Sequence, residues 1–375
     1  MRKTVYFFTV LFIFFTVIVT QTGCSNDNVS SKKEIKEQTK NVKENESLIG
    51  FLEQSGNFIN SHRIPTLISA DDVRANLKKY LVIDIRRHND YVEGHIDGAI
   101  NVAPSDLVAY MKNKVAAGTY DKIVMVCYSG HRASFSSMML QLLGYSNVYS
   151  MKWGMSSWDK NTANKKWIKR ISDKYSLKLE TSDNPKSEGA KLPEIHTGKI
   201  LGYDILEARV DTVLKKLKFE IGVDKLMENP TDYYIVNYWP VYNYKKGHLP
   251  GSVQYTPKQS LIRTADLLTL PTDKIIVVYD YTGQHASFVA AYLQVLGYDA
   301  YALTYGANSF MHSKLTSLQI GHTFDKTQVK EYPMIQGELP SLKTAGPVVD
   351  NSEEDNAPVP IIKKKNRKEE EEGGC

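Results

Sequence analysis

The chain carries one domain-sized stretch twice, and this repeat limits the possible folds more than any other feature of its 375 residues. The segment VIDIRRHNDYVEGHIDGAINV from Val82 matches IVNYWPVYNYKKGHLPGSVQY from Ile235, and CYSGHRAS from Cys127 matches DYTGQHAS from Asp280. Both matches have the same offset along the chain. A repeat of this length is a whole domain rather than one unit of a solenoid. The sequence therefore predicts two copies of one domain.

Each copy alternates short β-branched runs with helical stretches. In the first copy VIDI, KIVMV and NVYSM are predicted strands, and ASFSSMMLQLL is a predicted helix that ends at Gly144. Such alternation favours an α/β fold, a parallel sheet flanked by helices on both faces. We expect two such domains, at 57–161 and 199–320, joined by a Lys-, Asn- and Ser-rich linker at 162–198.

The two ends of the chain differ in composition from the repeats. Residues 1–24 combine a basic start, a long uncharged apolar run and QTGC, which resembles a bacterial lipoprotein signal with lipidation at Cys24. An uncleaved membrane anchor is the alternative. We expect a flexible tether at 25–56 and a largely disordered tail at 321–375. Both readings of residues 1–24 predict a bacterial envelope protein on the exported side of the cytoplasmic membrane, at its periplasmic or extracellular face.

Charge and cysteine content argue against several classes of protein. The net charge of +5 comes from scattered lysines without a basic stripe, so no nucleic-acid partner is predicted. The three cysteines, Cys24, Cys127 and Cys375, are not the even set of a disulfide framework. No His/Cys cluster has the spacing of metal ligands, so we expect neither a metal nor an organic cofactor.

Cys127 lies where a predicted strand ends and a predicted helix begins, which is where open parallel sheets bind ligands. The N–H groups of a helix N-terminus, together with Arg132, would favour a thiolate and a bound anion. Gly130 lets the loop curl, Ser129 can donate a hydrogen bond, and His131 adds charge at lower pH. The predicted substrate-binding residues all belong to this loop: Tyr128, Ser129, Gly130, His131 and Ala133.

Four features, in order along the first copy, resemble the rhodanese family of sulfurtransferases. They are Asp84 and Arg86 in VIDIRR, EGHIDGAIN at 93–101, the loop CYSGHR, and Gly154 with Trp158. The resemblance covers about 62–160 and, more weakly, 200–312.

This resemblance implies a double displacement at Cys127. The thiol would accept sulfane sulfur from thiosulfate or a persulfide and pass it to a thiol-type acceptor, while Arg132 holds the anionic end of the donor. Asp84 and Arg86 would be supporting residues near the site. The loop at 127–132 is one residue shorter than that of related phosphatases, which favours sulfur transfer over phosphate-ester or arsenate chemistry. A non-catalytic binding scaffold, in which Cys127 senses redox state, is the alternative.

The second copy differs at every charged position of this site. Asp280 stands at the position of Cys127, and His285 at the position of Arg132. Asn237 and Trp239 replace the Asp and Arg of VIDIRR. We therefore expect an inactive domain that keeps the fold and has a possible role in binding a protein partner. The GGC terminus adds the hypothesis that Cys375 serves as an auxiliary thiol.

Overall fold

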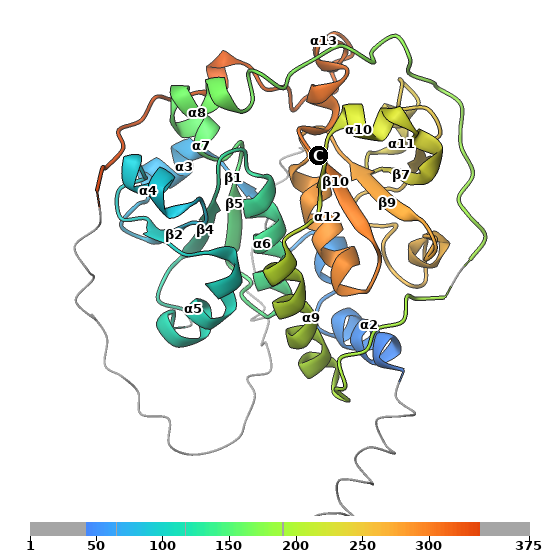
Figure 1. Cartoon of the computed structure of the whole chain (residues 1–375), viewed down its shortest axis with the longest axis horizontal. Coiled ribbons are helices and arrows are strands. Elements are labelled where there is room, and N and C mark those ends of the chain that lie inside the picture. Colours follow the sequence, from blue (N-terminus) through green and yellow to red (C-terminus); the bar gives the residue numbers. More distant parts are fainter. Residues whose placement is uncertain (1–42, 65, 117, 190, 338–375) are drawn as a thin grey trace, which may run out of the picture. The chain divides into compact units, whose positions relative to one another are not determined.

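The computed structural model describes residues 43–64, 66–116, 118–189 and 191–337, and it contains two five-stranded sheets (Figure 1). The strand orders are β1-β5-β4-β2-β3 and β6-β10-β9-β7-β8, which is the same topology twice. Every neighbouring pair of strands is parallel. Register repeats as well, since Tyr80 pairs with Lys122 in the first sheet and Tyr233 pairs with Ile275 in the second. The predicted duplication of an α/β domain is confirmed.

The N-terminal domain (residues 67–165) holds the first sheet, and the C-terminal domain (residues 202–317) holds the second. The elements of the N-terminal domain are β1 (Leu67–Ile68), α3 (Ala70–Ala75), β2 (Tyr80–Asp84), α4 (His88–Glu93), β3 (Ile100–Asn101), α5 (Leu107–Lys114), β4 (Lys122–Val126), α6 (His131–Leu142), β5 (Val148–Met151), α7 (Met155–Trp158) and α8 (Lys160–Lys165). Those of the C-terminal domain are α9 (Gly202–Lys216), β6 (Glu220–Ile221), α10 (Val223–Glu228), β7 (Tyr233–Asn237), α11 (Val241–Tyr244), β8 (Val253–Gln254), β9 (Ile275–Tyr279), α12 (Gln284–Val295), β10 (Ala300–Leu303) and α13 (His312–Ser317). A further helix, α2 (Glu44–Gln54), precedes them, and short 3-10 turns occur at Phe58–Asn60, Pro104–Asp106, Pro230–Asp232, Leu267–Thr269, Gly306–Ser309 and Lys326–Gln328.

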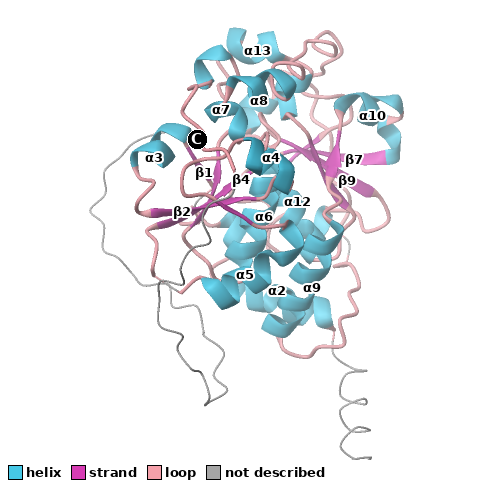
Figure 2. Ribbon diagram, turned by 60° about the vertical axis from the view of Figure 1, so that its left-hand side comes forward, coloured by secondary structure: helices cyan, strands magenta, loops and turns pink. Residues whose placement is uncertain are grey.

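Helices cover both faces of each sheet, as the strand–helix alternation predicts (Figure 2). In the N-terminal domain, α3, α4 and α7 pack on one face through Val73, Tyr91 and Trp158. The other face is covered by α5 and α6, which contribute Met111 and Leu140 to a separate apolar cluster. Because side chains of one strand point alternately to the two faces, β2 and β4 are apolar at nearly every position.

The two domains share one apolar core through α6 and α12, which lie side by side (Figure 1). Phe135 of α6 stacks on Phe219 with ring centroids 4.0 Å apart. Met139 and Leu142 of α6 belong to the same cluster as Phe288 of α12. Since α6 begins directly after the Cys127 loop, this shared core fixes the loop against the C-terminal domain.

The segments predicted as a tether, a linker and a tail are folded in part. The tether predicted at 25–56 contains α2, whose Leu48, Ile49 and Leu52 are buried in the shared core. The linker predicted at 162–198 begins inside α8 and includes the fully buried Trp167. The tail predicted at 321–375 includes the buried Phe324, and residues up to 337 pack on the domains. In each case large apolar side chains are buried against the domains and attach a stretch that is otherwise polar.

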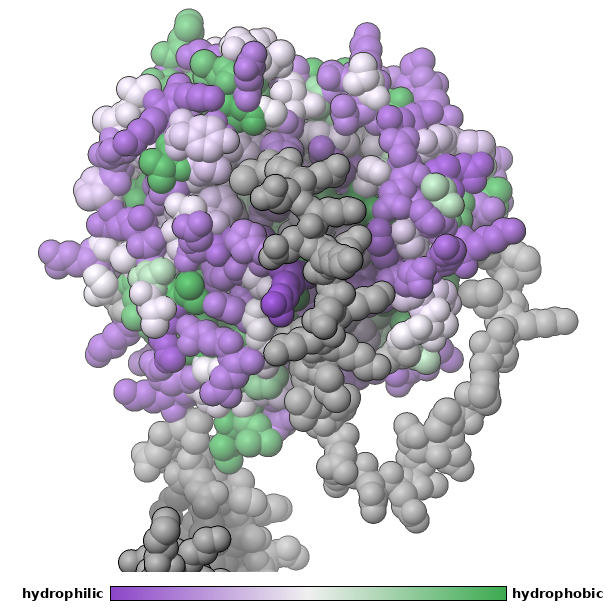
Figure 3. All heavy atoms as spheres, turned by 180° about the vertical axis from the view of Figure 1, so that it is seen from behind, coloured by the Kyte–Doolittle hydropathy of each residue, from purple (hydrophilic) through white to green (hydrophobic). Residues whose placement is uncertain are grey.

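Predictions for the remaining terminal residues lie outside the described part of the chain. These are the lipoprotein signal with Cys24, the rest of the tether, and the end of the tail with Cys375. Within residues 43–337, none of the helices that the structure describes is both long and apolar enough to cross a bilayer. The face shown in Figure 3 is mostly hydrophilic, and its apolar residues form small separate patches.

Candidate active site

Cys127 directly follows β4, and α6 begins at His131 after three intervening residues. Its Sγ accepts hydrogen bonds from the backbone N–H groups of Gly130, at 3.2 Å, and Ala133, at 3.3 Å. The loop can turn its amides inward because Gly130 adopts φ +92°, a left-handed conformation that favours glycine. The predicted convergence of loop amides on the sulfur atom is therefore present.

Gly154, one of the resemblance features, supports this loop from behind. Its φ is +59°, and a Cβ atom there would lie 2.5 Å from the carbonyl oxygen of Cys127 and 2.6 Å from the amide nitrogen of Gly130. The next residue, Met155, donates its N–H to the same Cys127 carbonyl at 2.8 Å. A larger residue than glycine would push the loop out of position.

The electrostatics of the thiol differ from expectation. Cys127 is only 2% exposed, and this burial raises the pKa of its thiol. The amides of Ala133, Ser129 and Gly130 act in the opposite direction, but the charge of Glu220 adds to the rise. The amides act on the thiol in the predicted direction, but the loss of hydration outweighs them, so the pKa of Cys127 lies above its ordinary value.

Arg132 lies at the edge of the loop and makes an ion pair across the domain boundary. Its Nε and Nη2 atoms both lie 3.0 Å from Oε2 of Glu220 in β6 of the C-terminal domain. Sequence reasoning missed Glu220. The repeat gave one indication of its special role: the residue at the position of Glu220 in the first copy is the apolar Leu67 of β1.

His131 is not placed to bind a substrate, contrary to prediction. It is 1% exposed, and burial lowers the pKa of its imidazole. Its Nδ1 lies 3.0 Å from the hydroxyl of Ser129, and its Nε2 lies 3.0 Å from the carbonyl oxygen of Thr282 and 3.1 Å from the amide nitrogen of Tyr305. His131 therefore joins the Cys127 loop to the matching loop of the C-terminal domain.

Gln284 makes the reciprocal connection from the C-terminal domain. It occupies the position of His131 in the second copy, at the start of α12. Its Oε1 accepts the N–H of Trp153 at 2.8 Å, and its Nε2 donates to the carbonyl of Met151 at 3.3 Å. The two loops are thus held together by a pair of buried side chains related by the internal repeat.

Two further aromatic residues surround the loop. Trp167, which follows α8, donates its indole N–H to the carbonyl of Ser129 at 3.1 Å. Tyr305 packs edge-on against His131 with ring centroids 4.8 Å apart. Neither residue was predicted, because one lies in the expected linker and the other in the second copy.

Asp84 and Arg86, the predicted supporting residues, lie next to the Cys127 loop. Asp84 and Arg86 make a buried ion pair, with Nη2 of Arg86 2.6 Å from Oδ2 of Asp84 and 2.7 Å from the carbonyl of Gly94. The Arg86 guanidinium lies over the ring of Tyr128 at 5.8 Å, and the ammonium of Lys166 lies over that ring at 4.6 Å. Asp84 and Arg86 therefore act on the loop through Tyr128 and the chain around Gly94.

The matching loop of the C-terminal domain holds a carboxylate where the first holds a thiol. Oδ1 of Asp280 accepts the N–H of Ala286 at 3.2 Å, and Oδ2 accepts the N–H of Thr282 at 3.2 Å and its hydroxyl at 3.0 Å. Burial alone would raise the pKa of Asp280, but His285 and these amides together lower it. The loop amides thus bind an anion built into the chain.

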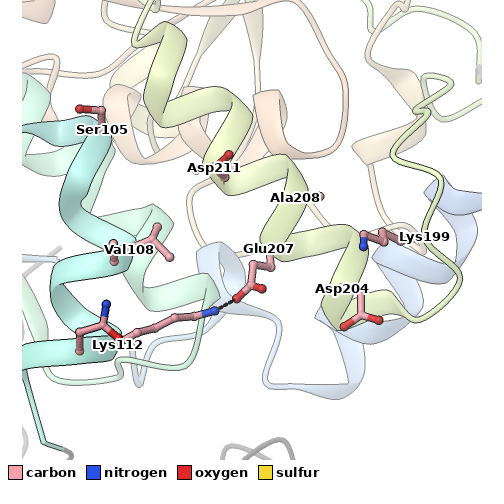
Figure 4. A pocket seen from close by; sticks show the side chains of 10 residues that line it. Ser105, Val108, Lys112, Lys199, Asp204, Glu207, Ala208 and Asp211 are labelled. Carbon is pink, nitrogen blue, oxygen red and sulfur yellow. Dashed lines mark hydrogen bonds and ion pairs between the residues drawn. The ribbon is translucent and has the colours of Figure 1, made fainter.

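A separate pocket lies between α5 and α9 (Figure 4). Its volume is about 500 Å³, and Lys112 and Glu207 form an ion pair across it. Its other lining residues are Ser105, Val108, Ala109, Asn113, Lys199, Asp204, Ala208 and Asp211. These carry no thiol and no imidazole, so the pocket offers no nucleophile of the kind at Cys127. Among the described residues, no cluster of His, Cys, Asp and Glu is arranged to hold a metal ion.

Comparison with known proteins agrees with this geometry. Residues 69–161 and 223–313 match the family described as rhodanese-like domain. A thiosulfate sulfurtransferase of Shewanella oneidensis is 32% identical over 87 residues, which are 23% of this chain and 82% of that protein. A tRNA uridine(34) hydroxylase of Buchnera aphidicola is 30% identical over 110 residues, but the match spans only 33% of its length and 26% of this chain.

A solved structure gives a weaker match. The crystal structure of thiosulfate sulfurtransferase from Pseudomonas aeruginosa matches 80% of this chain and 49% of its own, at 18% identity and a TM-score of 0.26. From the match of both repeats and the identity to the Shewanella protein over most of its length, the chain belongs to the rhodanese-like family of sulfurtransferase-type proteins and contains two such domains.

Proposed function

We propose that this protein is a sulfurtransferase that carries sulfane sulfur on Cys127. The observation that supports this most directly is the loop itself, in which the backbone N–H groups of Gly130 and Ala133 point at Sγ. A persulfide on Cys127 would place its negative terminal sulfur next to such donors, which stabilise an anion.

The reaction is a double displacement. In the first step the Cys127 thiolate attacks the outer sulfur of thiosulfate, the donor S–S bond breaks, and sulfite leaves with the electron pair. In the second step an acceptor thiolate attacks the terminal sulfur of the Cys127 persulfide. The bond to Sγ breaks, the Cys127 thiolate is regenerated, and the acceptor becomes a persulfide. No external oxidant or reductant is needed.

The shape of the loop supports sulfur over phosphate chemistry. With Cys127 2% exposed, a donor reaches Sγ best through a narrow terminal atom, and a sulfane sulfur is such an atom. A tetrahedral phosphate needs several converging donors around a wider opening. The C-terminal domain has no thiol, and Asp280 already occupies its amides, so it is proposed to be catalytically inactive.

A sulfur-loading experiment tests the proposal. The full chain is incubated with thiosulfate, and its intact mass is compared with that of a Cys127→Ser variant. We expect the wild type alone to gain one sulfur atom, and cyanide then to remove it as thiocyanate. If neither thiosulfate nor glutathione persulfide loads the wild type, a non-catalytic binding role replaces the enzyme.

We also propose that the protein is anchored in the bacterial cell envelope through residues 1–24. The support is the basic start, the apolar run and the cysteine of QTGC. Labelling of growing cells with a fatty-acid analogue should mark the wild type and not Cys24→Ser. An unlabelled protein that still fractionates with membranes would instead indicate an uncleaved anchor.

A further inference from the structure

A pair of opposite charges lies beside Cys127, one from each domain. Arg132 of the Cys127 loop and Glu220 of β6 share the 3.0 Å contacts described above, and their side chains are 49% and 28% exposed. The charge of Glu220 also raises the pKa of the Cys127 thiol. A donor that approaches Sγ from the side of this pair meets a cation and an anion together.

This arrangement is poorly suited to a donor with two negative charges. Thiosulfate must approach Arg132 while the Glu220 carboxylate already accepts its Nε–H and forms an ion pair with its Nη2. It must either displace Glu220 or tolerate its repulsion, and both reduce the binding of a dianion. The C-terminal domain thus partly cancels the charge that would recruit such a donor.

The same pair leaves one polar atom on each partner available. Both contacts use Oε2 of Glu220, and among the described residues neither Oε1 of Glu220 nor Nη1 of Arg132 has a hydrogen-bond partner. An α-amino acid carries a carboxylate and an ammonium group on one carbon atom. Its carboxylate can bind Arg132 while its ammonium binds Glu220, so no charge at the pair is left unmatched.

We propose that Arg132 and Glu220 together select a sulfur donor of the α-amino-acid persulfide class, such as cysteine persulfide, over thiosulfate. This inference rests on the proposed sulfurtransferase function and assigns its donor. Glu220 is then a specificity-determining residue supplied by the inactive domain.

The transfer is balanced without a further reactant. A persulfide anion, RSS⁻, meets Cys127 as the thiol. The sulfane sulfur forms a bond with Sγ, the donor S–S bond breaks, and the proton of the thiol goes to the leaving sulfur. The sum is Cys127–SH + RSS⁻ → Cys127–SS⁻ + RSH. Because the attacking group supplies the proton, a buried thiol is less of a handicap here than with thiosulfate.

The experiment compares four donors on the full chain. Cysteine persulfide has both charged groups, 3-mercaptopropionate persulfide lacks the ammonium, cysteamine persulfide lacks the carboxylate, and thiosulfate is the dianion. The initial rate of single-sulfur gain is measured by intact mass at equal, low donor concentrations. We expect cysteine persulfide to react about tenfold faster than either truncated persulfide, equivalent to about 1.4 kcal/mol.

Glu220→Gln tests the residue itself. Removing the carboxylate lowers the pKa of Cys127 and so changes the loading rates of all donors together. The informative quantity is therefore the ratio of the loading rates of two donors. The ratio of cysteine persulfide to 3-mercaptopropionate persulfide should fall towards one, and thiosulfate should gain relative to both. Glu228→Gln is the matched control, since it removes the same charge from an exposed pair with Lys225 in α10 and should leave the ratio unchanged.

The outcomes separate the two proposals. Equal rates with all three persulfides in the wild type would overturn the assignment of the donor and leave sulfur transfer intact. Sulfur loading by none of the four donors would overturn sulfur transfer itself. If Glu220→Gln does not fold, the comparison of donors on the wild type still decides.

Discussion

Gly130→Ala tests whether the contact between the two domains controls the Cys127 loop. A Cβ atom at Gly130 would lie 2.2 Å from Nε2 and 2.6 Å from Cδ of Gln284. The Gln284 side chain must then leave its place, and the Trp153 N–H that it accepts at 2.8 Å loses its partner. The alanine must also adopt the left-handed backbone φ of +92° found at Gly130.

The two effects can be given separate magnitudes. Left-handed backbone costs a non-glycine residue roughly 1–2 kcal/mol, and a buried N–H without a partner costs about 1–3 kcal/mol. We therefore expect Gly130→Ala to lower the free energy of unfolding by about 2–5 kcal/mol, the sum of these two costs. The Sγ contact from the Gly130 amide should weaken too, so sulfur loading should slow.

Gly98→Ala is the matched control. Gly98 also has a left-handed φ, +74°, but a Cβ atom there meets no other atom within 4 Å. Gly98→Ala should lower the free energy of unfolding only by the cost of the left-handed backbone, about 1–2 kcal/mol, and should leave the rate of sulfur loading unchanged. Urea denaturation and thiosulfate loading of both variants give the comparison. Equal losses of stability in Gly130→Ala and Gly98→Ala would refute the role of Gln284. A Gly130→Ala/Gln284→Ala double variant would refute it too, if its loss of stability were the sum of the losses of the two single variants.

Three further predictions concern single side chains. The rate of Cys127 alkylation by iodoacetamide should rise with pH, with a midpoint above the ordinary thiol pKa of about 8.5, because burial and the charge of Glu220 raise the pKa of Cys127. Glu220→Gln should lower that midpoint. A midpoint below the ordinary value would contradict the described burial of the thiol. Asp280→Cys should still give one sulfur atom per chain, not two, since no arginine follows in that loop, and it should lose stability because the contacts to Thr282 disappear. Burial lowers the pKa of His131, so the unfolded chain binds its proton more readily, and stability should fall as pH drops below about 6.5. His131→Gln should abolish this part of the pH dependence in denaturation curves, and an unchanged pH profile would show that other groups cause it.

The local parts of the site were predictable from the sequence because they depend on residues close together in the chain. A β-branched run, a cysteine, a glycine and a helical stretch define a strand, a loop and a helix start, and the structure has β4, the loop and α6 in that order. The repeat supported this prediction, because the same pattern of strand, loop and helix occurs around Asp280. Asp84 and Arg86 were expected near the loop by resemblance; in the structure the Arg86 guanidinium lies over the ring of Tyr128 in the loop, and Asp84 pairs with Arg86.

The parts that could not be predicted come from distant segments. Glu220 and Tyr305 reach the Cys127 loop only because α6 and α12 pack together, and sequence spacing does not encode that packing. His131 shows the same limit, because a polar residue at a helix start is expected to face solvent or ligand. Here the neighbouring domain buries it and supplies its partners.

The loop that holds Asp280 has a structural reason to keep its shape. It presents the carbonyl of Thr282 to His131, and a change in its path would withdraw this carbonyl. The amide of Tyr305, which follows β10, lies against the same imidazole. The Asp280 carboxylate binds the loop amides internally and so holds that path without a ligand. The domain can therefore lose the thiol chemistry and still form one wall of the neighbouring site. If Cys127 transfers sulfur as proposed, the C-terminal domain contributes to the site through Glu220 beside Arg132 and through Thr282 and Tyr305 against His131, so that the two copies act as one unit.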